Sequence, residues 1–341
     1  MSGTDRAVSR ERLLAMMTAF KSTYLLRAAL ELRIFDALAD GPADPDDVAA
    51  IVRTNPRATR VLLRALAAAG LLDMDGEQFQ LVSGARELLT TSSPQYGGGV
   101  VRVAASDWEW DAMKNLADVV RHGGTLLDVN AETPGFPYWV DFATHLTFAT
   151  KPGAEFVADL LVPWAEDRPS LDVLDVGCGH GLFGFSVAAR DPRARVTCLD
   201  WPEVLDVART YAERLQVADR VDYLPGDAFE VPLNGRYDAI VLGNFLFQFP
   251  PSRGIDLLRR LASTLKPGGR VLIVGFTTGD RPPAQDYHAH MLSLLMLAWT
   301  SQGELHSPLM YQKMLASAGL VDLDTHEKPG LPLRVVGGRR A

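Results

Sequence analysis

The sequence predicts an α/β protein in which a helical N-terminal domain precedes a mostly parallel sheet covered by helices. Its 341 residues exceed the roughly 250 to 300 at which a single core usually stops growing, so we expect two domains. From Leu171 onward, apolar strand patterns alternate with helical ones. The run Asp172 to Val176 leads into glycines at 177, 179 and 181, which is typical of a buried parallel strand that turns tightly under a ligand.

The sheet domain is expected at residues 156–341. The predicted strands are 173–176, 195–199, 221–224, 237–243, 270–276, 321–325 and 331–336, and the predicted helices are 182–190, 202–215, 252–265 and 309–318. The last two strands predict an antiparallel edge. In a sheet of this kind the ligand lies over the carboxyl ends of the parallel strands.

Residues 1–100 predict a winged-helix-like domain. Helical spacing runs from Leu13 to Leu32, Asp44 caps a short helix, and a third helix begins at Asn55. A hairpin follows, with its turn at Asp75–Gly76. A DNA reader should be basic, but residues 1–100 hold 11 Lys and Arg against 12 Asp and Glu. Dimerisation is therefore the favoured role, and a DNA-binding regulator is the alternative.

Residues 101–155 are interpreted as linker helices that contribute to a substrate pocket. Aromatic residues gather in this part of the chain, among them Trp108, Trp139 and Phe142. They either pack the two domains together or line a pocket for a flat apolar substrate. Met291 and Met296, in a long insertion after the strand at 270–276, are candidates for the same pocket.

The three glycines do not match the common phosphate-binding loops. A dinucleotide fingerprint reads G-x-G-x-x-G and a P-loop ends in Gly-Lys-Ser/Thr, whereas this loop reads G-x-G-x-G. Asp200 closes the next strand, where an acid can accept both ribose hydroxyls. Asp175, ahead of the glycines, would repel a pyrophosphate but suits a ligand that carries an amino group and a sulfonium. These features favour S-adenosylmethionine as the cofactor.

Five motifs in order carry a family resemblance. They are Leu174-Asp175-Val176-Gly177-x-Gly179-x-Gly181, Asp200-x-Pro202, Gly226-Asp227-Ala228-Phe229, Asn244 at a strand end, and Leu265-Lys266-Pro267-Gly268-Gly269. Together they resemble the class I S-adenosylmethionine-dependent methyltransferases, which share a Rossmann-like sheet. With the winged helix, the chain resembles the caffeate- and flavonoid-type small-molecule O-methyltransferases and their bacterial homologues in antibiotic and pigment pathways. The resemblance covers nearly the whole chain and implies an intertwined homodimer.

The resemblance also implies a cofactor site. The three loop glycines would lie along the methionine part of the cofactor, Asp200 would hold the ribose, and Asp227 with Phe229 would frame the adenine. The full candidate set for cofactor binding is Asp175, Gly177, Gly179, Gly181, Asp200, Trp201, Asp227, Ala228, Phe229 and Asn244. Trp201 either stacks on the adenine or packs in the core. His180, inside the loop, is expected to hydrogen-bond locally or to face the cofactor.

One segment departs from the family pattern. Members that methylate oxygen read roughly Leu-Lys-Asn-x-Leu-His-Asp-Trp after the fourth strand, where this chain ends in Phe247, Gln248 and Phe249. Their supporting Glu aligns with Leu305, and Glu304 could compensate. A phenol attacks poorly without a base, whereas an electron-rich carbon, an enolate or a neutral amine carries its own nucleophilic electrons. The sequence therefore favours C- or N-methylation, with Phe247 and Gln248 in the substrate pocket.

Other interpretations stay open on the acceptor side. O-methylation could proceed by proximity, or with a relocated base among His145, His288, His290 and His306. These histidines follow no fixed ligand motif, so no metal is expected. A cofactor-bound relative that does not transfer methyl is a further alternative.

Composition indicates an ordinary globular chain, with 47% hydrophobic and 22% charged residues. Its net charge of −8 argues against broad affinity for nucleic acid or anionic membranes. Two cysteines, no signal-peptide pattern and no apolar run near the about 20 residues of a membrane span together predict a cytoplasmic protein. The expected function is a homodimeric methyltransferase that acts on a small aromatic or polyketide-like acceptor in secondary metabolism.

Overall fold

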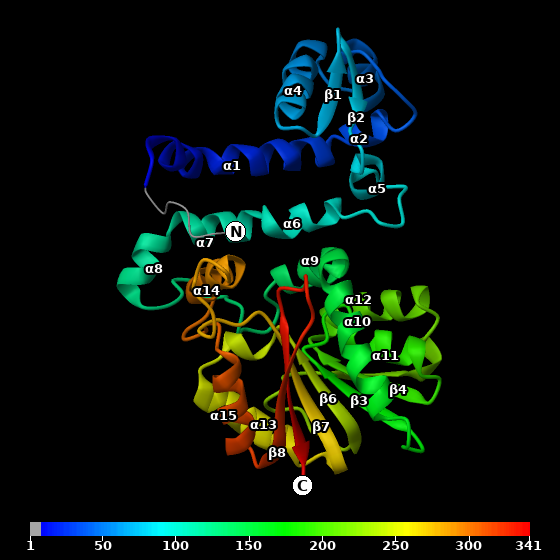
Figure 1. The fold of residues 1–341 in the computed structure, drawn as a ribbon, viewed down its shortest axis with the longest axis vertical. Coiled ribbons are helices and arrows are strands. Elements are labelled where there is room, and N and C mark those ends of the chain that lie inside the picture. The colour runs from blue at the N-terminus through cyan, green and yellow to red at the C-terminus, as the bar shows by residue number, and fades with distance from the viewer. Residues whose placement is uncertain (1–7) are drawn as a thin grey trace. The chain divides into compact units, whose positions relative to one another are not determined.

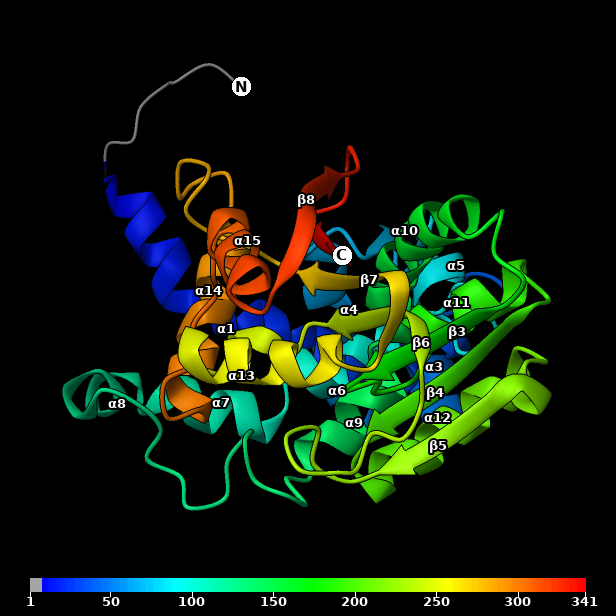
Figure 2. The same cartoon turned by 90° about the horizontal axis from the view of Figure 1, so that it is seen from below.

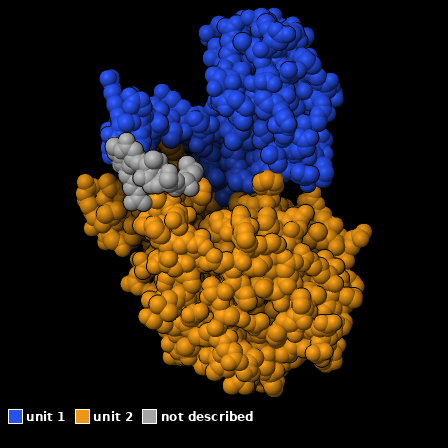
Figure 3. Space-filling view, viewed as in Figure 1, with its two compact units in different colours: residues 1–107 blue, residues 108–341 orange. Residues whose placement is uncertain are grey.

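The structure is a computed structural model that describes residues 8–341 (Figure 1). The chain separates into two compact units, Met1–Asp107 and Trp108–Ala341 (Figure 3). Each unit has a hydrophobic core of its own.

The first unit consists of helices followed by a two-stranded wing, as predicted. Its elements are α1 (Arg10–Glu31), α2 (Ile34–Ala37), α3 (Pro45–Val52), α4 (Pro56–Ala68), β1 (Leu72–Asp75), β2 (Gln78–Leu81), α5 (Ala85–Leu89), η1 (Gly98–Val100) and α6 (Val101–Ala104). The predicted helix caps are confirmed, because the Asp44 carboxylate accepts backbone N–H groups at the start of α3 and the Asn55 side chain does so for α4. Phe35, Leu63 and Phe79 pack together beneath the antiparallel hairpin.

The second unit is built on a twisted sheet. Its strands lie side by side in the order β5-β4-β3-β6-β7-β9-β8. Its strands are β3 (Leu171–Val176), β4 (Ala194–Asp200), β5 (Val221–Pro225), β6 (Tyr237–Gly243), β7 (Leu265–Gly275), β8 (Leu320–Glu327) and β9 (Arg334–Arg340). The strands β3 to β7 run parallel, and β9 pairs antiparallel with both β7 and β8. The predicted antiparallel edge is therefore confirmed.

Helices cover both faces of this sheet (Figure 2). The helices of the unit are α7 (Asp107–Lys114), α8 (Leu116–His122), α9 (Tyr138–His145), α10 (Thr147–Trp164), α11 (Leu182–Arg190), α12 (Pro202–Arg214), η2 (Ala218–Arg220), η3 (Leu246–Gln248), α13 (Pro251–Ala262), α14 (Tyr287–Trp299) and α15 (Pro308–Ser317). One face buries Leu161, Phe185 and Leu205 from α10, α11 and α12. The other face packs against α13 and α15.

Several predicted element bounds are wrong. The strand expected to begin at Arg270 already begins at Leu265. The helix expected to reach Leu265 ends at Ala262, because Leu265 already pairs with Tyr237 in the sheet. The strand expected at 331–336 is β9, which starts and ends later in the chain. Gly337 would normally indicate the end of a strand, but the Asp324 side chain occupies the space where a Cβ at this position would lie.

The carboxyl ends of the parallel strands, where a ligand is expected, can be located from the direction of the last strand. β9 ends next to the C-terminus and runs antiparallel to β7, so the carboxyl ends of the parallel strands lie at the opposite end of the sheet. Helices α9 and α14 lie at that end (Figure 1). Across residues 8–341, no helix combines the length and the apolar composition that crossing a membrane requires.

Candidate cofactor and acceptor site

The glycine loop follows β3 and uses left-handed backbone conformations at all three glycines, with φ of +63°, +55° and +79° at Gly177, Gly179 and Gly181. A Cβ at Gly177 would strike the ring of Phe245, and one at Gly181 would strike the ring of Phe185. A Cβ at Gly179 would meet no heavy atom of the described chain within 4 Å. Gly177 and Gly181 are thus required by the protein's own packing, and Gly179 leaves its side open for a ligand.

Asp200, at the end of β4, is held against this loop. Its carboxylate accepts the N–H of Gly179 at 2.8 Å and its neighbour's N–H, that of Trp201, at 2.7 Å. Burial raises the pKa of Asp200 to about 6, although the residue keeps some exposed surface. A carboxylate offers about four lone-pair directions, so two remain after these bonds. Asp200 can therefore accept further donors, such as a pair of hydroxyls, from the ligand side.

Asp175 lies beneath the loop with none of its surface exposed. Its Oδ2 accepts the N–H of Gly184 at 3.0 Å at the start of α11, while Oδ1 has no hydrogen-bond partner in the part of the chain that the structure describes. Burial is the main reason that the pKa of Asp175 is raised to about 7.

His180 also points its side chain into buried space. Its Nδ1 accepts the N–H of Leu182 at 3.2 Å, which confirms the predicted local hydrogen bond. Burial lowers the pKa of His180 to about 4, so the ring is neutral at pH 7 and carries its proton on Nε2. Among residues 8–341 this Nε2 has no partner. The ring packs edge-on to Tyr211, with ring centroids 6.3 Å apart.

The residues expected at the adenine lie in the segment between β5 and β6. Asp227 accepts the N–H of Phe229 at 2.8 Å, which fixes the turn that carries both residues, and Ala228 between them is buried. The Phe229 ring packs against Phe249 at 4.8 Å, and the Arg253 guanidinium lies 4.3 Å from the Phe229 ring centre. Trp201, half-buried, caps the start of α12.

Asn244 follows β6 in a left-handed conformation, with φ of +51°, and its N–H donates to the Val274 carbonyl at 2.8 Å. The next residues form η3, where Phe247 and Gln248 are both buried. Leu305 is buried too, and its carbonyl accepts the Thr278 hydroxyl. Phe247 and Leu305, which the sequence pattern predicts at the positions of the base and its supporting acid, are thus buried side chains that cannot accept a proton at neutral pH.

The segment after α14 packs directly on η3. A Cβ at Gly303 would lie 2.9 Å from the carbonyl oxygens of Phe247 and Gln248, so the absence of a side chain permits this approach. The Gly303 N–H donates to the Thr300 hydroxyl at 2.7 Å, which ties the segment back to the end of α14. Trp299, the last residue of α14, directly precedes this segment.

An aromatic cluster surrounds Trp299. Its members meet at ring-centre distances of 4.3 to 6.1 Å and are Trp108, Phe136, Tyr138, Trp139, Phe142 and Trp299. Trp108, Trp139 and Phe142 are sequence-predicted substrate residues, and the structure brings them together. Of the two predicted methionines on α14, Met296 is buried and Met291 is 39% exposed.

The sequence did not predict Glu109 as a residue of this region. Glu109 accepts the Tyr138 hydroxyl at 3.0 Å, and burial raises the pKa of Glu109 to about 7. The partners are 29 residues apart in the chain, so spacing could not reveal them. The available signal was a carboxyl placed between two tryptophans, Trp108 and Trp110.

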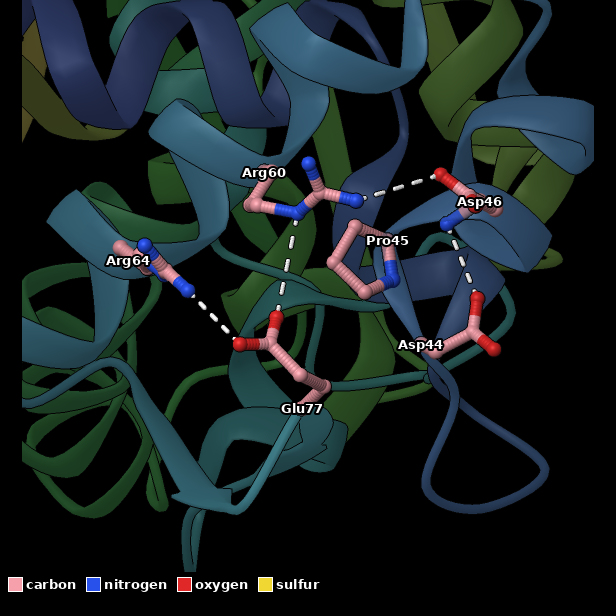
Figure 4. Close-up of a pocket in the computed structure, with 6 residues that line it drawn as sticks. All are labelled: Asp44, Pro45, Asp46, Arg60, Arg64 and Glu77. Carbon is pink, nitrogen blue, oxygen red and sulfur yellow. Dashed lines mark hydrogen bonds and ion pairs between the residues drawn. The ribbon is translucent and has the colours of Figure 1, made fainter.

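The first unit has a shallow hollow of its own, lined by Asp44, Pro45, Asp46, Arg60, Arg64 and Glu77 (Figure 4). Arg64 pairs with Glu77 at 2.7 Å, and Arg60 lies within 4 Å of both Asp46 and Glu77. Both arginines are on α4, the helix that would read DNA in a winged helix. Because acids of the same unit already pair with them, the hollow offers little to a phosphate backbone.

Comparison with known proteins identifies the family. The profile described as the O-methyltransferase domain matches residues 166–321, and the O-methyltransferase dimerisation domain matches residues 14–91. The chain belongs to the O-methyltransferase family. It is a methyltransferase that uses S-adenosylmethionine, which confirms the predicted cofactor.

Three similar proteins show how far the likeness extends. The tetracenomycin polyketide synthesis 8-O-methyltransferase of Streptomyces glaucescens is 28% identical over 95% of both chains. A candidate O-methyltransferase from Nostoc punctiforme has a structure with a TM-score of 0.89 at 29% identity, covering 98% of this chain and 100% of its own. Human N-acetylserotonin methyltransferase, solved with S-adenosylmethionine, gives 0.83 at 25% identity over 100% and 99% of the two chains.

The residues of this methyltransferase fit S-adenosylmethionine on three structural observations. Gly179 leaves open space beside the loop, Asp200 has spare acceptor capacity, and Oδ1 of the buried Asp175 has no hydrogen-bond partner within the described residues. A sulfonium with an ammonium group supplies the positive charge that these two carboxylates lack. The residues that would hold the cofactor are those of the loop with Asp200, Asp227 and Phe229.

The four candidate histidines of the methyltransferase come from α9, α14 and the segment between α14 and α15. His306 is buried with Nε2 at 3.4 Å from the Phe249 carbonyl oxygen, and burial lowers its pKa. His288 is exposed and His290 half-buried on α14, where residues two apart do not face each other. His145 is half-buried on α9. Among residues 8–341, no group of three His, Cys, Asp or Glu residues is arranged to hold a metal ion.

Proposed function

We propose that this methyltransferase methylates a phenolic hydroxyl oxygen of a small aromatic, polyketide-like acceptor in secondary metabolism. The observation that carries the proposal is the aromatic cluster around Trp299, which lies beside η3 and contains a carboxyl group, Glu109. Flat rings pack well against such a cluster, because edge-to-face contacts between aromatic groups are favourable. A phenol hydroxyl of the acceptor can donate a hydrogen bond to the Glu109 carboxyl group of this cluster.

Named relatives support an oxygen acceptor. They include a mitomycin 6-O-methyltransferase of Streptomyces lavendulae and a 3-hydroxy-5-methyl-1-naphthoate 3-O-methyltransferase of Streptomyces sahachiroi, both 26% identical. Like the tetracenomycin 8-O-methyltransferase, both are named for transfer of a methyl group to oxygen. The comparisons do not support the preference for C- or N-methylation that the sequence suggests.

A nitrogen acceptor is the second candidate, because Phe247 and Gln248 are buried and leave the usual base position without a titrating group. A neutral amine needs no base. One relative, from Streptomyces rimosus, is named an N,N-dimethyltransferase, and another, from Streptomyces purpurascens, is named an aclacinomycin 10-hydroxylase. Product analysis distinguishes the two acceptor atoms.

The chain's own residues have two tasks in this reaction. The bound cofactor supplies the electrophilic methyl group. The cluster holds the acceptor ring so that its oxygen is in line with that methyl, and such positioning alone can contribute several powers of ten in rate. Buried residues such as Phe247 and Trp299 exclude water from the same space.

We further propose that the enzyme acts as a homodimer through its first unit, whose dimerisation domain spans residues 14–91. Helix α1 carries large apolar side chains that are exposed in the single chain, including Leu14 at 51% and Met16 and Met17 at 68% each. An apolar helix face of this kind is commonly buried by a partner. Light scattering of the full chain tests this, and a monomer at micromolar concentration would contradict it.

The proposed reaction is tested with isotope-labelled S-adenosylmethionine and three acceptors. These are 3-hydroxy-5-methyl-1-naphthoate, N-acetylserotonin and an aromatic amine without a hydroxyl group. Methyl transfer to a phenol oxygen, located in the product by NMR, supports the proposal. Label found on nitrogen or carbon, or S-adenosylhomocysteine formed without a methylated product, contradicts it.

A further inference from the structure

The aromatic cluster contains a carboxyl and a hydroxyl that the cofactor site does not use. Tyr138 on α9 donates its hydroxyl to Oε1 of Glu109 on α7 at 3.0 Å. Tyr138 is 3% exposed and packs edge-on against Trp299, with ring centres 4.3 Å apart. The pair therefore lies within the cluster proposed to receive the acceptor ring.

The same cluster contains an unsatisfied donor. The indole N–H of Trp299 has no hydrogen-bond partner among the described residues, and the side chain is 1% exposed. A buried polar group without a partner is costly, and structures keep few of them. A ligand that brings an oxygen to this N–H removes the cost. The cluster is thus equipped with a donor and an acceptor for one polar aromatic ring.

Two connections place the pair near the methyl transfer site. The segment that follows Trp299 packs on the carbonyls of Phe247 and Gln248, where the family pattern has its base. The other end of α9 is tied to the cofactor loop, because the Tyr211 hydroxyl donates to the Thr144 carbonyl at 2.9 Å and Tyr211 packs against His180. Helix α9 therefore connects the glycine loop with the Glu109–Tyr138 pair.

We infer that Glu109, oriented by Tyr138, is the catalytic base that takes the acceptor's phenol proton in place of the histidine replaced by Phe247. This inference rests on the proposed O-methylation. In the step, the phenol O–H bond breaks and its proton passes to the Glu109 carboxylate. The phenol oxygen forms a bond to the methyl carbon, the carbon–sulfur bond breaks, and its electron pair stays on sulfur, which becomes a neutral thioether. Glu109 then returns its proton to water.

The charge environment of Glu109 suits this role. Burial raises its pKa to about 7, and the hydrogen bond from Tyr138 lowers it in part. Tyr138 acts on Glu109 through its hydrogen bond, and Asp141 on the same helix acts in turn on Tyr138. A base with a pKa near 7 is about half ionised at neutral pH and is closer to a phenol's pKa of about 10 than an ordinary carboxylate is.

Kinetics with a phenol acceptor test the base directly. Replacing Glu109 by glutamine should lower kcat for 3-hydroxy-5-methyl-1-naphthoate about 100- to 10,000-fold, the range for a lost general base, with an unchanged Kd for S-adenosylmethionine. The acidic limb of the wild-type pH–rate profile, near pH 7, should disappear. Nitrophenols that are already ionised at pH 8 should lose much less, because they need no base. An equal loss for both acceptors would overturn the inference.

Tyr138→Phe separates a positioning role from a merely structural one. Because the Tyr138 hydroxyl lowers the pKa of Glu109, its removal should move the acidic limb to higher pH and leave substantial activity at pH 9. The matched control is Asp111→Asn, a change at an exposed carboxyl on the same helix, which should leave the limb where it is. A limb that does not move in Tyr138→Phe would contradict the assignment.

A binding measurement decides the inference even if the naphthoate is not methylated. Calorimetry of 2-naphthol with the S-adenosylhomocysteine-bound enzyme should show about tenfold tighter binding at pH 8 than at pH 6, because ionised Glu109 accepts the phenol proton in a hydrogen bond. Glu109→Gln should abolish this difference. Absence of binding, or the same pH dependence in the variant, would overturn the assignment of Glu109, whereas retained pH-dependent binding with methyl found on nitrogen would overturn only O-methylation.

Discussion

Two pairs of carboxylates at opposite ends of the parallel sheet have contrasting environments. At the amino end, Asp238 accepts Arg168 and Lys266 at 2.7 Å each, and Lys266 also contacts Asp172 at 2.5 Å. At the carboxyl end, neither Asp175 nor Asp200 forms an ion pair with any described residue, and the pKa of each is raised by burial.

The contrast separates stability from function along the same strands. Lysine and arginine from the protein itself neutralise the amino end, where Lys266 belongs to the Lys-Pro-Gly-Gly motif. That motif is therefore a structural clamp in this chain. The carboxyl end retains uncompensated negative charge, which is costly in a folded protein unless a ligand supplies the opposite charge. A cationic cofactor completes it.

The largest predicted effect is at the amino end. Asp238→Asn removes one partner of two cations and should lower the free energy of unfolding by about 2 to 3 kcal/mol, somewhat less than for a fully buried pair because Lys266 and Arg168 keep some contact with water. Urea unfolding of the cofactor-free protein measures it. The Kd for S-adenosylmethionine should stay within about twofold, and a large loss of cofactor affinity would contradict the structural role.

At the carboxyl end, Asp200→Asn should lower cofactor affinity and leave stability nearly unchanged. Loss of a charged acceptor should weaken S-adenosylmethionine binding about 30-fold, as expected for hydrogen bonds to an ionised group. The cofactor-free protein should lose little stability, because the variant also removes a buried charge. Calorimetric titration measures the affinity, with Asp222→Asn, at an exposed site on the neighbouring strand β5, as the control.

Two glycines of the loop should show the same separation of stability from cofactor binding, with smaller effects. Gly177→Ala adds a clash with the Phe245 ring to its backbone strain, whereas Gly179→Ala has the strain alone. Gly177→Ala should therefore lower stability by about 1 kcal/mol more than Gly179→Ala. When both variants are assayed under conditions where they are folded, Gly179→Ala should bind S-adenosylmethionine more weakly than Gly177→Ala does. Equal affinities for the two variants would show that the ligand does not approach Gly179.

The smallest predicted effect is a pH dependence of stability. An unfolded Asp has a pKa of about 3.9 and folded Asp175 about 7, so the folded protein binds more protons between these values and its stability falls as pH rises through that window. Between pH 6.5 and 7.5, Asp175 should contribute a loss of about 0.7 kcal/mol. Asp175→Asn should remove this part of the slope in urea unfolding, and an unchanged slope would show that Asp175 is already ionised.

Local patterns were sufficient for much of the fold. The helix at 182–190 and the strand at 237–243 match their predictions, because glycines or turns bound an apolar run on both sides. The last strand could not be placed, since Gly337 belongs to it for a tertiary reason, the nearby Asp324 side chain. Sequence patterns report local preference, and this position is decided by packing.

The site was predictable to the extent that it lies in contiguous motifs. The glycine loop and Asp200 lie against each other as expected, with a hydrogen bond between Gly179 and Asp200. The Glu109–Tyr138 pair and the packing of Phe245 on Gly177 join distant segments, and nothing in the spacing indicates them. The complete burial of Asp175 was likewise not visible, because strand patterns do not show which side chain a helix will cover.

The most direct test of the incomplete carboxyl end is the number of protons released when S-adenosylmethionine binds. At pH 6.5, groups with pKa values of about 7 and about 6 are about three-quarters and one-quarter protonated, and a bound cation drives both toward the ionised form. Calorimetry in two buffers of different ionisation enthalpy should therefore detect release of about one proton per cofactor, and less than half of that in Asp175→Asn. No release, or net uptake, would contradict a cofactor site organised around these two unpaired carboxylates.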